Sequence, residues 1–280
     1  QVSSGRVTDV VRNGELTKFI TQLSDGLRIE SVIIPMTRHQ TLCVSSQVGC
    51  RMGCRFCRTA KMGFQRSLEP HEIVGQLFNA RFVLMAEIKN IVFMGMGEPF
   101  DNFSAVMQAV HVMNEQKGLD VAFRHITLST AGLIGGIRAL ADKGLTNIRL
   151  AVSINSADET LRSQIMPVSR ANSLKDLKEA LMAYRLPKRG TFLFEYILIK
   201  GLNDSLKDAI QLAEYINPMP VRLNLIPYNP VGGFDFGSVD DAHMHQFADM
   251  LTDQGVFVVK RWSKGQSVGA GCGQLGGAAC

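Results

Sequence analysis

The sequence lacks the features of a membrane or secreted protein. No apolar run among its 280 residues approaches the roughly 20 residues that a membrane-spanning helix needs. The amino terminus has no basic segment followed by an apolar one, which is the pattern of a secretory signal. No internal repeat and no low-complexity linker stands out. These absences predict a soluble cytoplasmic protein that does not associate with a membrane.

A strong excess of one charge is missing as well. The 30 basic residues outnumber the 25 acidic residues by an ordinary margin, so the net charge of +5 favours an anionic partner only weakly. Hydrophobic residues make up 46% of the chain, which is enough for one large core. Single-domain α/β barrels have this size.

Short apolar runs alternate with segments of helical period, which is typical of repeated βα units and a parallel sheet. The expected strands cover residues 42–48, 90–94, 125–129, 148–153, 192–199 and 222–226. The expected helices cover residues 70–84, 104–115, 133–142, 174–184, 205–216 and 240–251. Six βα units are fewer than the eight of a closed barrel. The pattern therefore predicts an α/β fold with a partial, TIM-like (β/α)6 barrel.

A hairpin precedes the first expected barrel strand. Residues 18–23 and 28–35 flank the turn signal Ser24-Asp25-Gly26. We therefore expect a small β appendage over residues 1–40 and the barrel over residues 41–280. The glycine-rich end, residues 265–277, is expected to form a loop.

Cys50, Cys54 and Cys57 form the strongest chemical pattern, directly after the first expected barrel strand. Three thiolates at this spacing hold three irons of a 4Fe-4S cluster and leave the fourth iron open to a ligand. The alternative is a zinc site, but zinc normally takes four ligands in paired spacings, and the sequence offers no second Cys/His pair. A disulfide framework is typical of short secreted chains that lack a large core. This chain has 280 residues and enough apolar residues for a core, so we expect the clustered thiols to bind metal.

Five further motifs stand out along the chain. They are Cys43-Val-Ser-Ser-Gln-Val-Gly-Cys50, Met94-Gly-Met-Gly-Glu-Pro99, Leu128-Ser-Thr-Ala-Gly132, Asn224-Leu-Ile-Pro-Tyr-Asn229 and Cys272-Gly-Gln-Leu275. Taken together and in this order, they resemble the motifs of the RlmN/Cfr family of radical SAM RNA adenine methyltransferases. The resemblance runs from about Glu30 to Leu275. Family members carry a helical domain ahead of the hairpin, and we expect this chain to lack it.

The resemblance implies a radical SAM barrel with a 4Fe-4S cluster and S-adenosyl-L-methionine (SAM) as cofactors. It also implies RNA as the partner, namely an adenosine in the peptidyl-transferase centre of 23S ribosomal RNA, transfer RNA or both, and an electron donor such as flavodoxin. We expect a monomer. The family's scheme methylates the cysteine at Cys272, transfers its carbon to the adenine ring by a radical route, and releases the product when Cys43 forms a disulfide with Cys272. Glu30 matches the family's proton acceptor.

The residues that match the family's SAM contacts are Gly97, Glu98, Ser129, Ser153, Ile154, Asn155 and Asn229. The family usually has histidine where Asn155 stands. Without the resemblance, Cys43 reads as a small core residue, Cys272 as an incidental loop thiol, and the polar SAM-site residues as turn and capping residues. Cys280 has no family counterpart.

Methylation at carbon 2 of adenine is the favoured reaction, and two alternatives remain: methylation at carbon 8, or a radical SAM reaction on another substrate. An iron–sulfur electron-transfer protein is a rival from a different class. It explains the three clustered cysteines but leaves Glu30, Cys43 and Cys272 without a purpose. Two basic runs either bind RNA phosphates or are merely solvated. The first comprises Arg51, Arg55, Arg58 and Lys61, and the second comprises Lys260, Arg261 and Lys264.

Overall fold

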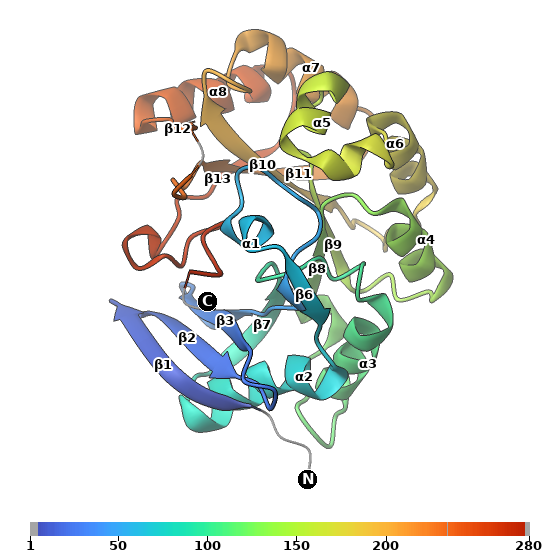
Figure 1. Ribbon diagram of the computed structural model, residues 1–280. Coiled ribbons are helices and arrows are strands. Elements are labelled where there is room, and N and C mark those ends of the chain that lie inside the picture. Colours follow the sequence, from blue (N-terminus) through green and yellow to red (C-terminus); the bar gives the residue numbers. More distant parts are fainter. Residues whose placement is uncertain (1–4, 234, 278–280) are drawn as a thin grey trace. The chain divides into compact units, whose positions relative to one another are not determined.

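A computed structural model describes residues 5–233 and 235–277 (Figure 1). The chain folds into two compact units. Unit 1 comprises Gln1–Arg51, Cys57–Ser129 and Lys264–Cys280, and unit 2 comprises Met52–Phe56 and Thr130–Ser263. The border expected at residue 40 does not coincide with these boundaries and stays a prediction. Cys280 lies outside the described residues.

The strands of unit 1 form a mixed sheet. Its order is β1 (Arg6–Asn13), β2 (Leu16–Gln22), β3 (Arg28–Pro35), β4 (Gln40–Cys43), β7 (Ile88–Phe93) and β8 (Ile126–Thr130). The pairs from β1 to β4 are antiparallel, and β4, β7 and β8 are parallel. The expected hairpin is present, and β1 adds a strand to it that the sequence pattern did not indicate.

The expected single strand over residues 42–48 is wrong. Strand β4 ends at Cys43, and a separate strand β5 (Gln47–Gly49) pairs with β6 (Phe64–Ser67). Between them, the backbone N–H of Ser45 donates to the Gln76 side chain at 2.7 Å, and its hydroxyl donates to the Glu30 carbonyl oxygen at 2.7 Å. These buried polar contacts turn the chain out of the sheet, since they replace ladder hydrogen bonds.

Within the described residues, the α-helices of unit 1 are α1 (Arg58–Lys61), α2 (Pro70–Phe78) and α3 (Phe103–Asn114). A capping box formed by Glu69 and Glu72, with Pro70 in the first turn, starts α2. The helix expected to run to residue 84 changes at Asn79 into a π-helical turn, Asn79–Val83.

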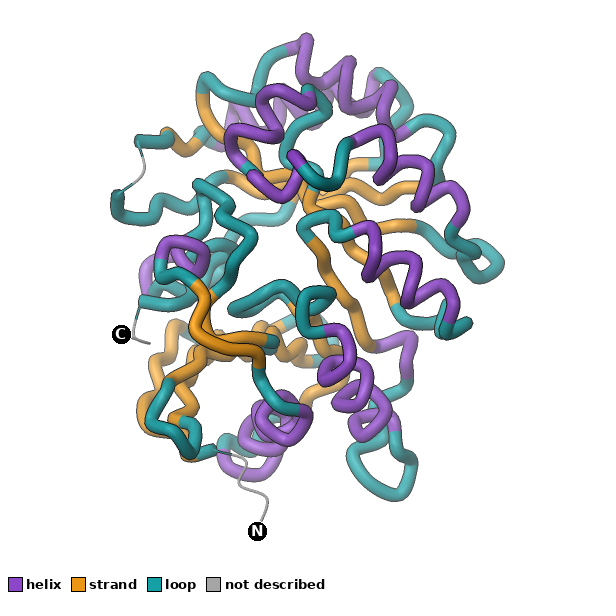
Figure 2. The backbone as a smooth tube through the Cα atoms, turned by 45° about the vertical axis from the view of Figure 1, so that its right-hand side comes forward, coloured by secondary structure: helices purple, strands orange, loops and turns teal. Residues whose placement is uncertain are grey.

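Unit 2 continues the strand–helix alternation. Its parallel strands follow the order β9 (Arg149–Ser153), β10 (Phe192–Lys200), β11 (Val221–Pro227) and β13 (Val258–Lys260), and β12 (Gly237–Ser238) pairs with β10. Its helices are α4 (Ile134–Asp142), α5 (Glu159–Ile165), α6 (Leu174–Ala183), α7 (Leu206–Ile216) and α8 (Asp241–Asp253). In Figure 2 the helices of this unit lie along the outer side of its strands.

The six expected βα repeats are all present in the described part of the chain. Strands β4, β7, β8, β9, β10 and β11 are each followed by at least one helix before the next parallel strand. The strand interiors are buried and apolar, as in Phe194, Tyr196 and Leu198 of β10. Parallel strands covered on both faces have this composition. Within residues 5–233 and 235–277, no helix is long and apolar enough to cross a membrane.

Candidate active site

The loop that carries Cys50, Cys54 and Cys57 follows β5 and ends at α1. All three thiols are half-buried. The turn before Cys50 requires glycine, because Gly49 has a φ of +77° and an added Cβ would lie 1.8 Å from the Gly63 carbonyl oxygen. The sequence therefore builds a tight entrance to the cysteine loop.

The donor chemistry of this loop suits an iron–sulfur cluster. No three His, Cys, Asp or Glu side chains within the described residues are placed to ligate one metal ion. A 4Fe-4S cluster binds each of its thiolates to a different iron, so it does not need the spacing of a single-ion site. Three thiols within eight residues, without a histidine between them, fit that group better than zinc.

The loop that carries Cys272 packs against the start of α1, the helix that follows Cys57 in the chain. The backbone N–H of Arg58 donates to the Gly273 carbonyl oxygen at 2.7 Å, and the Thr59 hydroxyl donates to the Leu275 carbonyl oxygen at 2.7 Å. Gly276 is needed there, since an added Cβ would lie 2.1 Å from the Met62 sulfur. The Cys272 side chain itself is exposed.

The same loop is also attached to the strands of unit 1, beside which its red trace runs in Figure 1. The Lys18 ammonium lies 3.3 Å from the Gly269 carbonyl oxygen and 3.2 Å from a Glu30 carboxylate oxygen. Asn13 donates to the Ser267 hydroxyl at 3.0 Å. The segment that leads to Cys272 is thus fixed to β2 by the lysine that pairs with Glu30.

Strand register places Glu30 and Cys43 on one face of the sheet. Lys18 of β2 lies opposite Val32 of β3, and Val32 lies opposite Cys43 of β4. Side chains opposite one another share a face, and so do residues two apart on a strand, such as Glu30 and Val32. Glu30 and Cys43 are both buried. The Cys272 loop lies over this face, because Lys18 reaches it from there.

The motif Gly97-Glu98 follows β7 and packs against Gln47, just before the cysteine loop. Gly97 has a φ of +98°, and an added Cβ would lie 2.6 Å from the Gln47 Cβ. The Glu98 N–H donates to the Gln47 side-chain oxygen at 2.9 Å. Its buried carboxylate accepts the Phe100 N–H at 3.0 Å. The glycine therefore permits close approach of Gln47, which the sequence did not indicate. Ser129 is half-buried near the end of β8.

Asn155 has a left-handed backbone conformation, and its side chain is hydrogen-bonded within unit 2. Its φ is +57°, a left-handed conformation that asparagine adopts more readily than most residues. Its side-chain oxygen accepts the Ile197 N–H at 2.8 Å, and its carbonyl oxygen accepts from the Asn203 amide at 2.7 Å. The buried Asn155 side chain thereby links the end of β9 to β10. In the same unit, the buried Asn229 amide donates to the Ser263 hydroxyl at 2.8 Å.

The sequence analysis missed Arg162 of α5, whose side chain is fully buried. Its guanidinium donates to the carbonyl oxygens of Ile154 at 3.0 Å and Ser153 at 3.2 Å, and also to Ala131 O at 2.8 Å and Ser169 Oγ at 2.8 Å. Burial lowers the pKa of Arg162, and electrostatic interactions with Tyr215, Glu159 and Cys54 oppose that shift. Arg162 shares a face of α5 with Ile165, three positions further on, and that spacing was the available signal.

The sequence analysis also missed Glu195, a single charged residue inside the apolar strand β10. It lies between Ser153 and Asn224 in the register of β9, β10 and β11. Burial raises the pKa of Glu195, and Arg261 and the Asn224 amide partly oppose that effect. Asn224 donates to one carboxylate oxygen at 2.8 Å.

Comparison with known proteins agrees with this arrangement. A sequence profile described as the Radical SAM superfamily matches residues 44–213. The crystal structure of a radical SAM methyltransferase from Sphaerobacter thermophilus, 36% identical, superposes with a TM-score of 0.92 over 98% of this chain and 81% of that one. The fold is therefore the radical SAM α/β fold, as the sequence predicted.

Curated relatives narrow the class further. "Probable dual-specificity RNA methyltransferase RlmN 1" of Protochlamydia amoebophila is 40% identical over 96% of this chain and 75% of its own length. "Dual-specificity RNA methyltransferase RlmN" of Lawsonia intracellularis is 44% identical over 92% of this chain and 75% of its own length. The chain belongs to the RlmN family of radical SAM enzymes. A 4Fe-4S cluster and SAM are accordingly its cofactors.

Proposed function

We propose that this chain methylates an adenosine of RNA at carbon 2 of the adenine ring, with Cys272 carrying the methyl group. The observation that carries the proposal is the double attachment of the Cys272 loop. On one side of Cys272, Arg58 binds Gly273 immediately after the cluster ligand Cys57. On the other side, Lys18 binds both Gly269 and Glu30. This loop thus connects the proposed cluster ligands with the proposed base.

When bound, the cluster and SAM supply the methyl group and the radical chemistry that an unreactive ring carbon needs. Cys272 holds the methyl carbon, for which its exposed position on a loop is suitable. Glu30, buried beside Lys18, takes the proton from the ring carbon. Cys43 then attacks the Cys272 sulfur as a thiolate and forms a disulfide with it. The bond between this sulfur and the RNA-bound carbon breaks, its electron pair passes to the adenine, and the released carbon takes up a proton and becomes the methyl group.

The residues proposed to hold SAM all follow or end strands of the parallel series, where α/β barrels place their active sites. Cys50, Cys54 and Cys57 hold the cluster. In unit 1, Gly97, Glu98 and Ser129 contact SAM. In unit 2, Ser153, Ile154, Asn155 and Asn229 do so. Because Asn155 keeps its side chain on Ile197, its contribution to SAM is assigned to the backbone and not to the amide.

The RNA substrate is supported by the names of the relatives, which describe dual-specificity RNA methyltransferases. Ribosomal and transfer RNA are the two proposed substrates, and the RlmN names favour carbon 2 over carbon 8. Glu30, the proposed proton acceptor, is buried, so the adenine must leave the base stack of the RNA to reach it. An electron donor such as flavodoxin, a monomeric state and a cytoplasmic location complete the proposal.

Three measurements test the function. Mass spectrometry of the purified protein should find one methyl group on Cys272, and Cys272→Ala should lack it. Digestion of treated RNA should yield 2-methyladenosine with the unaltered protein and none with Cys272→Ala. Cys272→Ala should nevertheless cleave SAM under reduction, since it leaves the cluster ligands intact, whereas Cys57→Ala should not. Methylated RNA from Cys272→Ala would contradict the proposal. If the unaltered protein yields 8-methyladenosine, the methylated position is carbon 8 and not carbon 2.

A further inference from the structure

Unit 1 contains a cavity away from the residues discussed so far. It lies at the amino ends of β4, β7 and β8, where Gln40, Ile88 and Ile126 begin these strands. Its volume is about 670 Å³, within the range of small-molecule sites. Cys43 and the Gly97-Glu98 motif are at or beyond the opposite, carboxyl ends of β4 and β7. The cavity is thus separate from the proposed active site.

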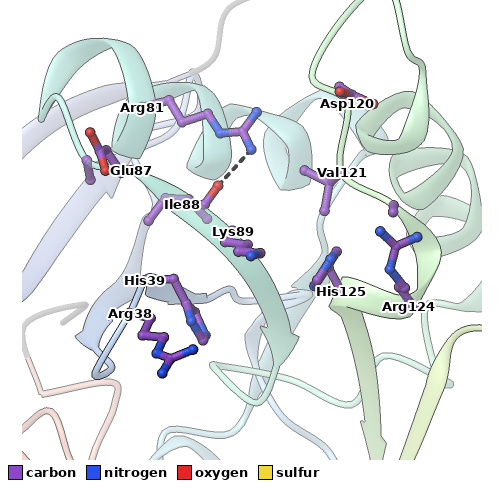
Figure 3. Close-up of a pocket in the computed structure, with 12 residues that line it drawn as sticks. Arg38, His39, Arg81, Glu87, Ile88, Lys89, Asp120, Val121, Arg124 and His125 are labelled. Carbon is purple, nitrogen blue, oxygen red and sulfur yellow. Dashed lines mark hydrogen bonds between the residues drawn. The ribbon is translucent and has the colours of Figure 1, made fainter.

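Basic side chains dominate the lining of this cavity. Four of them are the cations Arg38, Arg81, Lys89 and Arg124, two are the imidazole rings of His39 and His125, and the two carboxylates are those of Glu87 and Asp120. In Figure 3 the two carboxylates lie on either side of Arg81 at the upper edge of the view, and the remaining cationic groups gather below them. The two carboxylates therefore lie nearest Arg81, and the other cations lie apart from them.

Three of these cations are available to a ligand. Arg38, Lys89 and Arg124 are exposed. Among residues 5–233 and 235–277, none forms a hydrogen bond or an ion pair with their charged groups. Arg81 differs, because its guanidinium donates to the carbonyl oxygens of Leu119 and Ile88. Arg81 is therefore held by the backbone that lines the cavity, whereas Arg38, Lys89 and Arg124 are available to bind an anion.

A hydrogen-bonded chain fixes the two histidines. The Asn90 amide nitrogen lies 2.7 Å from His39 Nε2, and its oxygen lies 2.8 Å from His125 Nδ1. Both contacts are satisfied when His39 accepts from the amide and His125 donates to it. His39 then keeps its Nδ1–H as a further donor. The cavity therefore has an imidazole donor that is fixed by Asn90 of β7, in addition to long surface side chains.

We propose that this cavity binds a phosphate-bearing ligand through Arg38, Lys89 and Arg124. Guanidinium groups bind phosphate oxygens in pairs, and a lysine adds a point charge between them. The phosphate belongs either to the backbone of the RNA or to a free nucleotide. Strand β7 is six residues long, about 20 Å, so a folded RNA that reaches its carboxyl end can extend its backbone to this cavity. The RNA source rests on the proposed function.

The test compares two triple variants of equal charge. The first is Arg38→Ala/Lys89→Ala/Arg124→Ala. The control is Arg138→Ala/Lys175→Ala/Lys207→Ala, in which three exposed cations on α4, α6 and α7 are removed. Substitutions at exposed sites should leave both variants folded, which thermal unfolding checks. A third variant with Gln at the three cavity positions keeps the side-chain bulk. Each protein is titrated with a transfer-RNA stem-loop and, separately, with ATP.

If RNA is the source, the cavity variants should bind the stem-loop at least tenfold more weakly than the control. The slope of log affinity against log salt should fall by about 2, since each lost phosphate contact contributes roughly 0.7 to 0.9. If a free nucleotide is the source, ATP should bind the unaltered protein and the control but not the cavity variants.

Equal affinities of the cavity and control variants for both probes would overturn the phosphate site. RNA methylation by the unaltered protein, measured in parallel, separates this result from a failure of the proposed function. If the unaltered protein methylates RNA while the cavity variants bind both probes normally, only the phosphate site fails. If it neither binds nor methylates RNA, the proposed function and the RNA source fail together, and the ATP titration alone decides the phosphate site.

Discussion

The Lys18 ammonium lies 3.2 Å from a Glu30 carboxylate oxygen, and both side chains are buried. The same ammonium binds the Gly269 carbonyl oxygen, three residues before Cys272. Burying two charges is costly unless they are paired and hydrogen-bonded. This ion pair therefore does more than stabilise β2 against β3, because it also fixes the segment that leads to the proposed methyl carrier.

Lys18→Met should weaken both the fold and the reaction. It leaves the Glu30 carboxylate buried without its ammonium partner, which typically costs about 3–5 kcal/mol of unfolding free energy. Urea unfolding measures this loss, and Lys18→Met/Glu30→Gln should recover part of it. RNA methylation should fall at least tenfold while reductive SAM cleavage persists. Wild-type stability and methylation in Lys18→Met would show that the pair has neither role.

Cys43→Ala should stop the reaction after the carbon has joined the RNA. Cys43 is buried and shares a sheet face with Glu30, so it is the thiol proposed to release the product. Gel electrophoresis should reveal protein covalently joined to RNA through Cys272, and RNase should trim the adduct. Cys43→Ser should trap the same species, because a hydroxyl does not form the disulfide. If Cys43 only fills the core, alanine costs about 1 kcal/mol and turnover continues without an adduct.

Arg162→Lys should destabilise unit 2 although it keeps the charge. The guanidinium donates to four oxygens, including the carbonyls of Ser153 and Ile154, and one ammonium cannot reach them all. Each buried acceptor left without a donor costs about 1–3 kcal/mol. Chemical denaturation should show this loss, and equilibrium dialysis should show weaker SAM binding. Arg170→Lys, an exposed site, is the matched control and should change neither quantity.

The repeated elements could be predicted from the sequence, because apolar runs and helical periods are local signals. The break after Cys43 could not, since it depends on Gln76 and Glu30, which are distant in the sequence. Cys50, Cys54 and Cys57 followed from their spacing, whereas the other site residues followed from motif resemblance. Lys18 and Gly269 are separated by 251 positions, and no local pattern connects them. Arg162 was missed because its acceptors become visible only when the strand ends are placed.

The last prediction concerns the pH dependence of stability, for which Glu195 is the informative residue. Burial raises the pKa of Glu195, against the opposing effects of Arg261 and the Asn224 amide. The folded protein thus keeps the Glu195 proton at pH values where the unfolded chain, with a glutamate pKa of about 4.3, has lost it. A state that binds more protons loses relative stability as pH rises, so this group destabilises the fold progressively above that pH.

Glu195→Gln removes this titration and keeps an oxygen that can accept from Asn224. The difference in unfolding temperature, variant minus wild type, should therefore increase as the pH rises from about 4 toward the raised pKa of Glu195 and then level off. Differential scanning calorimetry at several pH values measures it. Glu179→Gln, an exposed glutamate on α6, should give a difference that does not follow this trend. A difference for Glu195→Gln that stays constant or decreases over the same range would show that the carboxyl is ionised in the folded protein, held by Arg261 in spite of its burial.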